Sequence, residues 1–188
     1  MKIPVEISAR HIHLSEKDFK KLFGNDKTLI PVRKLSQPGE FASKEKVVII
    51  NSDKRIENVS VIGPFRNASQ AEISLTDAYN LKLKPIPNIK VSGDVSGAEK
   101  ILIKGQNSSI KIPCIIAKRH LHCSENEAKQ LKLGNNQKIS VKIKGIREIT
   151  FHEIIVRISK DYRLALHLDT DEGNSAGIFV KTSGEIIK

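Results

Sequence analysis

Residues 10–16 read RHIHLSE and residues 119–125 read RHLHCSE, so one seven-residue motif occurs twice in a chain of 188 residues. Each copy follows a short apolar segment, VEIS or CIIA, of a kind typical of a β-strand. Each copy also leads into a short helix that a serine, Ser15 or Ser124, would cap. Two occurrences of strand, R-H-x-H motif and capped helix predict two similar halves that arose by duplication.

The ends of these two helices can be predicted from the residues around them. We expect the first helix to begin after Ser15 and to stop at Gly24. In the second, Ser124 and Glu127 match the S-x-x-E capping box, and Gly134 is the expected stop. Helical signals elsewhere are few and brief.

The rest of the chain is rich in β-branched runs bounded by Gly, Asn and Asp, which favour strands. The predicted strands span residues 3–9, 46–50, 57–62, 100–104, 110–117, 138–143, 148–158, 163–169 and 177–181. Several are short and closely spaced, which favours small antiparallel barrels over a parallel sheet. Residues 31–44, PVRKLSQPGEFASK, interrupt the first half and are expected to form a lid or a small excursion.

Composition restricts the class of protein. Hydrophobic residues make up 39% and charged residues 28%, as in a soluble globular protein, and no apolar run reaches the length of a membrane-spanning helix. No secretory signal is recognised, and two cysteines are too few for a disulfide framework, so we expect an intracellular, reducing location. The net charge of +11 is read first as a scattered lysine surface and next as a sign of small anionic substrates. Nucleic acid ranks third, because 4% aromatic residues without tryptophan disfavour binding of single strands.

The histidine pairs are the strongest chemical signal. Side chains at i and i+2 of a strand point to the same side, so His11 and His13 can converge, as can His120 and His122. A single H-x-H pair is weak evidence for a metal site, because paired histidines also occur on solvated surfaces. Two pairs at equivalent places in a duplicated fold favour metal binding, and neutral imidazoles suit zinc or a similar ion.

Further ligands are expected near these pairs. In residues 163–169 the leucines alternate onto one face, which leaves His167 on the other. By itself His167 would be read as a half-exposed strand histidine, and it becomes a candidate ligand only beside the two H-x-H pairs. Imidazoles alone leave the charge of two divalent ions uncompensated, so a carboxylate is expected, and Glu72, shortly after the G-P-F-R turn, is the best candidate. Its competitors are Asp169, Asp171 and Glu172 in the segment DTDEGNSAG, which is read as a loop and lacks the pattern of a calcium site.

Other reactive residues are interpreted by their neighbours. Arg66 lies near the candidate ligand Glu72, and its guanidinium fork would bind a phosphate, although a surface arginine in a turn is the alternative. His152 has no partner at ligand spacing and is read as structural or surface-exposed. Cys114 and Cys123 lack the neighbouring base that a nucleophilic cysteine needs.

Five motifs occur in order between residues 4 and 178: SARHIHLS, LSQPGEFA, GPFRNASQAEIS, AKRHLH and HLDTDEGNSAG. Together they resemble the PduL-type phosphotransacylases, also called phosphate propanoyltransferases. The resemblance implies a mainly β fold of two small barrels capped by short helices, with the active site between them. It also implies that the N-terminal strand joins the C-terminal barrel, which gives one domain from residues 1–9 with 118–188 and another from residues 10–117.

The resemblance also implies a set of site residues. The family's metal ligands correspond to His11, His13, Glu72, His120, His122 and His167. Its phosphate-binding arginine corresponds to Arg66, and its coenzyme A contacts to Ile7, Ser8, Ala9 and Asn174. Two positions depart from the basic part of the family's coenzyme site, because Lys54 is only approximately placed and Ser60 stands where an arginine is common.

The implied activity is the reversible conversion of propionyl-CoA or acetyl-CoA and phosphate into an acyl phosphate and coenzyme A, with two zinc or similar divalent ions per chain. No nucleic-acid or membrane partner is expected, whereas a homodimer and contacts with the shell or enzymes of a microcompartment for propanediol degradation stay open. The chain begins almost at the first predicted strand, without the family's N-terminal targeting extension, so we expect a cytoplasmic enzyme, with the microcompartment lumen as the alternative.

Two other functions remain in competition at this point. A dizinc hydrolase of thioesters or phosphoesters would use the same metals and the same arginine. A basic binding module with structural zinc would instead have closed tetrahedral sites and salt-sensitive nucleic-acid binding.

Overall fold

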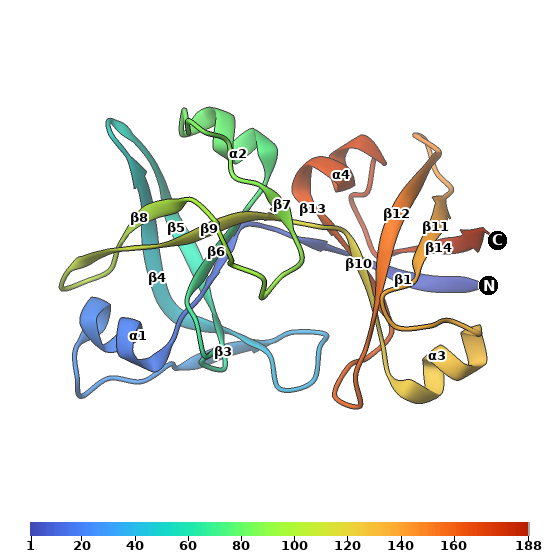
Figure 1. Ribbon diagram of the computed structural model, residues 1–188, viewed down its shortest axis with the longest axis horizontal. Helices are drawn as coiled ribbons and strands as arrows, with labels where there is room; N and C mark the ends of the chain where they lie inside the picture. The colour runs from blue at the N-terminus through green and yellow to red at the C-terminus, as the bar shows by residue number, and fades with distance from the viewer. Residues whose placement is uncertain (188) are drawn as a thin grey trace. The chain divides into compact units, whose positions relative to one another are not determined.

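The computed structural model describes residues 1–187 and divides into two compact units (Figure 1). Unit 1 contains Met1–Ala9 and the chain from Lys118 onward, and unit 2 contains Arg10–Ala117. Each unit has its own cluster of buried hydrophobic side chains. Among the described residues, no helix is both long enough and apolar enough to cross a lipid bilayer.

Unit 2 is a closed barrel with two short additions. Its ring runs through β4 (Phe41–Asn51), β5 (Lys54–Gly63), β2 (His11–His13), β6 (Gln70–Ile73), β9 (Ser109–Ala117) and β8 (Lys100–Lys104), and β8 pairs again with β4. Strand β3 (Pro31–Lys34) extends the sheet from β4, and β7 (Ile89–Lys90) pairs with β9. The helices are α1 (Glu16–Phe23) and α2 (Leu75–Asn80).

Unit 1 is a second closed barrel (Figure 1). Its strands follow the order β1 (Lys2–Ser8), β13 (Ala165–Asp169), β10 (His120–Cys123), β12 (Ile149–Ile158), β11 (Lys138–Ile143) and β14 (Thr182–Ile187). Its helices are α3 (Glu125–Leu131) and α4 (Thr170–Ser175).

The two barrels share one pairing pattern. The H-x-H strands β2 and β10 each pair in parallel with one neighbour, β5 or β12, and antiparallel with the other, β6 or β13. Strand β9 runs parallel to β6, as β1 runs parallel to β13, so β1 and β9 occupy equivalent places. Strand β1 belongs to unit 1 but directly precedes β2 of unit 2 in the sequence, and β9 belongs to unit 2 but directly precedes β10 of unit 1. The predicted mainly β fold, with two similar barrels and an exchanged N-terminal strand, is therefore confirmed.

The prediction of a strand at residues 177–181 is wrong. Gly177, with φ of +65°, follows the end of α4, and the extended pairing begins only at Thr182. The apolar side chains of Phe179 and Val180 are largely exposed rather than buried on a sheet face. Apolar character alone therefore gave the wrong position for the last strand.

Three other expectations need adjustment. Residues 31–44 form β3, a turn closed by the Leu35 amide donating to the Glu40 carbonyl, and the start of β4, so this segment is a hairpin. Helix α3 ends before Gly134, because Lys132 adopts the left-handed conformation. The segment read as a loop, DTDEGNSAG, contains α4, whose capping residue is Asp169.

Candidate metal centres and active site

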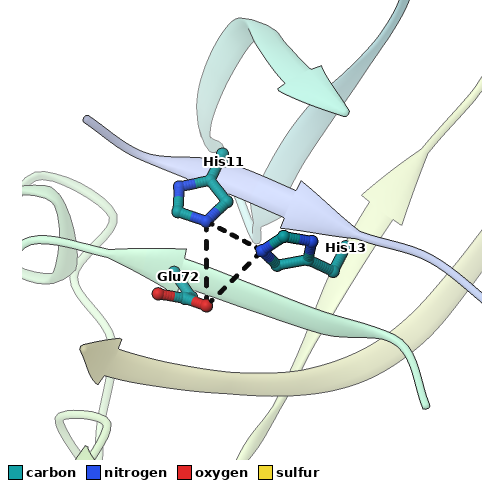
Figure 2. A group of neighbouring side chains, drawn as sticks. All are labelled: His11, His13 and Glu72. Atoms are coloured by element: carbon teal, nitrogen blue, oxygen red, sulfur yellow. Dashed lines mark hydrogen bonds and ion pairs between the residues drawn. The ribbon is translucent and has the colours of Figure 1, made fainter. Parts of the chain in front are cut away.

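The first candidate centre forms around strand β2 in unit 2. Ile12 is completely buried in the barrel core, so the flanking His11 and His13 project from the opposite face of the strand. Glu72 lies directly across from His11 on β6. The three side chains point toward one another in Figure 2. The two imidazole Nε2 atoms are 3.1 Å apart, and Glu72 Oε1 lies 3.7 Å and 3.8 Å from them.

The electrostatics of this group suit a cation. Burial would raise the pKa of Glu72, but the neighbouring His11 and His13 and a hydrogen bond from Ser92 hold it well below its usual value. Burial, with contributions from His11 and Arg66, holds the pKa of His13 well below that of an ordinary histidine. A buried carboxylate beside imidazole nitrogens is a donor set that zinc and similar divalent ions prefer. The residues present therefore fit a metal ion.

The second candidate centre forms around strand β10 in unit 1. The ring centroids of His120 and His122 are 4.5 Å apart, and His167 lies 5.2 Å and 4.9 Å from them. His120 Nδ1 lies 2.9 Å from the Lys118 carbonyl oxygen, a contact that favours a proton on Nδ1 and a lone pair on Nε2. Tyr162 stacks on His122 with ring centroids 4.0 Å apart. Three imidazoles thus share one small region.

The two centres are equivalent in register but differ in charge. Glu72 is paired with His11 as His167 is paired with His120, so the third member of each group comes from the same barrel position. This position holds a carboxylate in unit 2 and an imidazole in unit 1. In unit 1, Glu6 lies across from His167 on β1, and its Oε2 is 3.9 Å from His167 Nε2. Glu6 therefore brings negative charge to the three-histidine group, and sequence reasoning missed it.

Arg66 is linked to the first centre through one hydroxyl group. Its guanidinium donates to Ser92 Oγ at 3.2 Å and to Glu40 Oε1 at 3.4 Å. Ser92 Oγ in turn donates to Glu72 Oε1 at 2.6 Å. About a third of the arginine side chain is exposed, 31%, so it can still meet a ligand from solvent.

A second group of residues orients the Glu72 carboxylate. The Gln70 side-chain amide donates to Glu72 Oε1 at 2.5 Å and to Ser92 Oγ at 3.0 Å. Gln70 Oε1 accepts from the Gly93 amide. Sequence reasoning missed these partners. Gln70 carried a usable signal, because it is two residues before Glu72 on the same strand face, whereas Ser92 is brought in by a distant loop.

The four expected coenzyme contacts lie at one end of unit 1. Ile7 and Ser8 end strand β1, and Ala9 follows them. Ile7 packs against α4, since a Cβ at Gly173 would lie only 2.5 Å from Ile7 Cδ1. Asn174 is the next residue of this helix and is exposed. The structure therefore brings the β1 residues next to the helix that carries Asn174.

Residues 54 and 60, the two departures, lie on strand β5. Lys54 Nζ is 2.9 Å from the Asp53 carboxylate, and Ser60 Oγ accepts from Lys46 Nζ at 2.9 Å. The ammonium group of Lys46 therefore lies beside Ser60, although residue 60 is not itself basic.

The remaining candidates have other contacts. His152 is exposed and its Nδ1 lies 2.7 Å from Ser140 Oγ. Two of the competing carboxylates stabilise the start of α4: Asp169 is its N-cap, and Glu172, in its first turn, makes an ion pair with Arg119 at 2.6 Å. Among the described residues, Glu72 forms a group with His11 and His13 that could hold a metal ion.

Comparisons with known proteins match one family over nearly the whole chain. The family model described as phosphate propanoyltransferase matches residues 4–179. A protein of that name from Clostridioides difficile is 40% identical over 99% of this chain and 89% of its own length. Proteins of the same name from Sebaldella termitidis and Thermotoga maritima are 39% and 40% identical, over 98% and 93% of this chain and 87% and 83% of their own lengths. With this coverage, the chain belongs to the phosphate propanoyltransferase family and is an acyltransferase enzyme.

Proposed function

We propose that this enzyme reversibly transfers a short acyl group, propionyl or acetyl, between coenzyme A and inorganic phosphate, with zinc-class ions bound in the two histidine groups. The observation that carries the proposal is the buried convergence of His11, His13 and Glu72 in a chain of this family. Three ligands leave one position of a four-coordinate ion open, as in catalytic rather than structural zinc sites. A metal bound there would supply Lewis-acid polarisation of a carbonyl or phosphoryl oxygen.

Arg66 is the residue best suited to hold the phosphate. Its guanidinium offers parallel N–H donors that match two phosphate oxygens. Its contact with Ser92, which also bonds Glu72, keeps the guanidinium near the first histidine group, and Glu40 binds the same guanidinium. Because the Glu40 contact is long and partly exposed, a phosphate can replace it at small cost.

The transfer needs no covalent enzyme intermediate. A phosphate oxygen attacks the thioester carbonyl carbon, and the C–O bond forms as charge develops on the carbonyl oxygen. The C–S bond then breaks, and the proton lost by phosphate ends on the coenzyme thiol. Both substrates are anionic, so the net charge of +11 favours their approach.

A phosphate-dependence assay distinguishes this activity from that of a hydrolase. We expect thiol release from propionyl-CoA or acetyl-CoA to require phosphate and to yield acyl phosphate. A dizinc hydrolase would instead release the thiol at the same rate without phosphate. Repeating the assay over a series of acyl lengths measures the acyl preference, for which one methylene is worth about 1–3 kcal/mol.

The two cysteines provide an independent test of direct transfer. Burial raises the pKa of Cys114 to about 12 and that of Cys123 to about 11, so both remain protonated thiols near neutral pH. We expect iodoacetamide to leave the activity of the folded enzyme unchanged, while the denatured chain takes up a label at each cysteine. Rapid inactivation of the folded enzyme, or an acyl group trapped on either cysteine, would contradict direct transfer.

A further inference from the structure

A second, less obvious repeat contains the third residue of each candidate metal centre, Glu72 in unit 2 and His167 in unit 1. Residues 70–77 read QAEISLTD and residues 165–172 read ALHLDTDE. Each segment is a strand, a helix cap and the first turn of a helix, α2 or α4. In each, an acidic residue lies five positions after the third member: Asp77 after Glu72, and Glu172 after His167.

These acidic residues occupy the same capping position. Asp77 is the third residue of α2 and accepts from the Ser74 amide, which completes a capping box. Glu172 is the third residue of α4 and accepts from the Asp169 amide in the same way. Each carboxylate also binds a second partner, and that partner is the arginine of an R-H-x-H motif.

The contacts of Arg10 and Arg119 with these carboxylates are short, and the acidic side chains are largely buried. Arg10 Nε lies 2.8 Å from both carboxylate oxygens of Asp77, and its Nη2 lies 2.7 Å from Oδ1. Arg119 Nε lies 2.6 Å from Glu172 Oε1. The acidic side chains are only 2% and 16% exposed, unlike those of solvent-exposed ion pairs, which contribute little.

Each ion pair therefore joins the two strands that supply the metal ligands. Arg10 immediately precedes His11, and Asp77 is in the helix directly after the Glu72 strand. Arg119 and Glu172 connect the His120 and His167 strands in the same way. The H-x-H strands contain only three and four residues, so their ladders provide few hydrogen bonds to fix the position of the imidazoles.

We propose that Arg10 and Arg119 are positioning residues, which hold the first histidine of each motif against the third ligand through Asp77 and Glu172. This inference rests on the proposed metal binding. Partners outside the ligand set commonly change metal affinity by about 10–100-fold when they are removed. The arginines of the two R-H-x-H motifs thereby gain a role distinct from that of Arg66.

The chain offers a matched control for the test. Glu127 is also a third-position glutamate in a capping box of unit 1, with its Oε2 2.7 Å from both the amide and the hydroxyl of Ser124. It caps α3, which follows the H-x-H strand rather than the third-ligand strand. The variants Glu172→Ala and Glu127→Ala therefore lose the same kind of helix cap, and only the first loses the contact with Arg119.

The measurement is cobalt(II) affinity, followed by its visible absorption in competition with a chelator, on the whole chain without substrate. We expect Glu172→Ala to weaken one bound cobalt about 10–100-fold and Glu127→Ala to resemble the unsubstituted protein. Equal affinities in the two variants would overturn the positioning role. Absence of cobalt binding in the unsubstituted protein would instead overturn the proposed metal-dependent function.

Variants of the two arginines, whose side chains are partly exposed, test the same role without disturbing a helix cap. We expect Arg10→Gln to weaken the metal held by His11, His13 and Glu72 while the other site keeps its affinity. Arg119→Lys should retain more affinity than Arg119→Gln, because the ammonium keeps one charged contact with Glu172 but loses the guanidinium geometry. Unchanged cobalt affinity in Arg10→Gln and Arg119→Gln would contradict the proposal even if Glu172→Ala does not fold.

Discussion

The His11→Ala substitution is expected to reduce acyl transfer to phosphate by about 10³-fold or more, and His120→Ala should have an effect of the same size. Each removes one of three converging side chains that are proposed to bind a metal, and a catalytic metal supplies several kcal/mol of transition-state stabilisation. Because 1.36 kcal/mol corresponds to a factor of ten in rate, loss of the metal gives an effect of that order. Metal content, measured by elemental analysis, should fall by about one ion per chain in each variant.

His152→Ala is the control for these two variants. His152 is exposed and its imidazole contacts Ser140, whereas it meets Arg119 only through its backbone carbonyl, which an alanine keeps. We expect its activity and metal content to match those of the unsubstituted enzyme. If His152→Ala were the most damaging of the three, or if the protein contained no metal on which its activity depends, the ligand assignment would be wrong.

The sequence predicted the parts of this site that depend on local geometry. The i, i+2 spacing placed His11 and His13 on one side of a strand, and the recurrence of the motif at His120 predicted the second barrel. The buried leucines around His167 are visible in the same way, as a simple alternation. These features need only the period of a β-strand, which two or three neighbouring residues reveal.

The parts that were missed depend on tertiary contacts or on residue types with two roles. Ser92 and Glu40 reach Arg66 from segments that carry no periodic pattern, so only the folded chain brings them together. Asp169 and Glu172 compete with Glu72 as candidate ligands in the sequence because carboxylates bind metals, and in the fold they form a D-x-x-E capping box. The S-x-x-E pattern at Ser124 and Glu127 is less ambiguous, because a serine at this position predicts a cap, whereas an aspartate can be either a cap or a metal ligand.

Arg66→Ala is expected to lower turnover by about 10²–10³-fold, as does loss of one donor to a developing oxyanion in other enzymes. Arg66→Lys should recover only part of this loss, because an ammonium keeps the charge but not the fork that matches two phosphate oxygens. Metal content should remain normal. Glu72 keeps its hydrogen bond from Gln70, and Ser92 Oγ still accepts from that same amide when the arginine is gone.

Steady-state kinetics with each substrate varied in turn decide whether this arginine binds phosphate. In Arg66→Lys, the apparent affinity for phosphate, or for acyl phosphate in the reverse direction, should weaken, while that for coenzyme A changes little. Arg55→Ala is the control, since Arg55 is an exposed residue of β5 paired with Glu57, and its removal leaves the charge near Glu72 intact. A variant with normal phosphate kinetics but impaired coenzyme binding would instead assign Arg66 to the phosphates of coenzyme A. The guanidinium beside Ser92 would then hold the acyl donor, and the attacking phosphate would need another cation on the same side of the barrel.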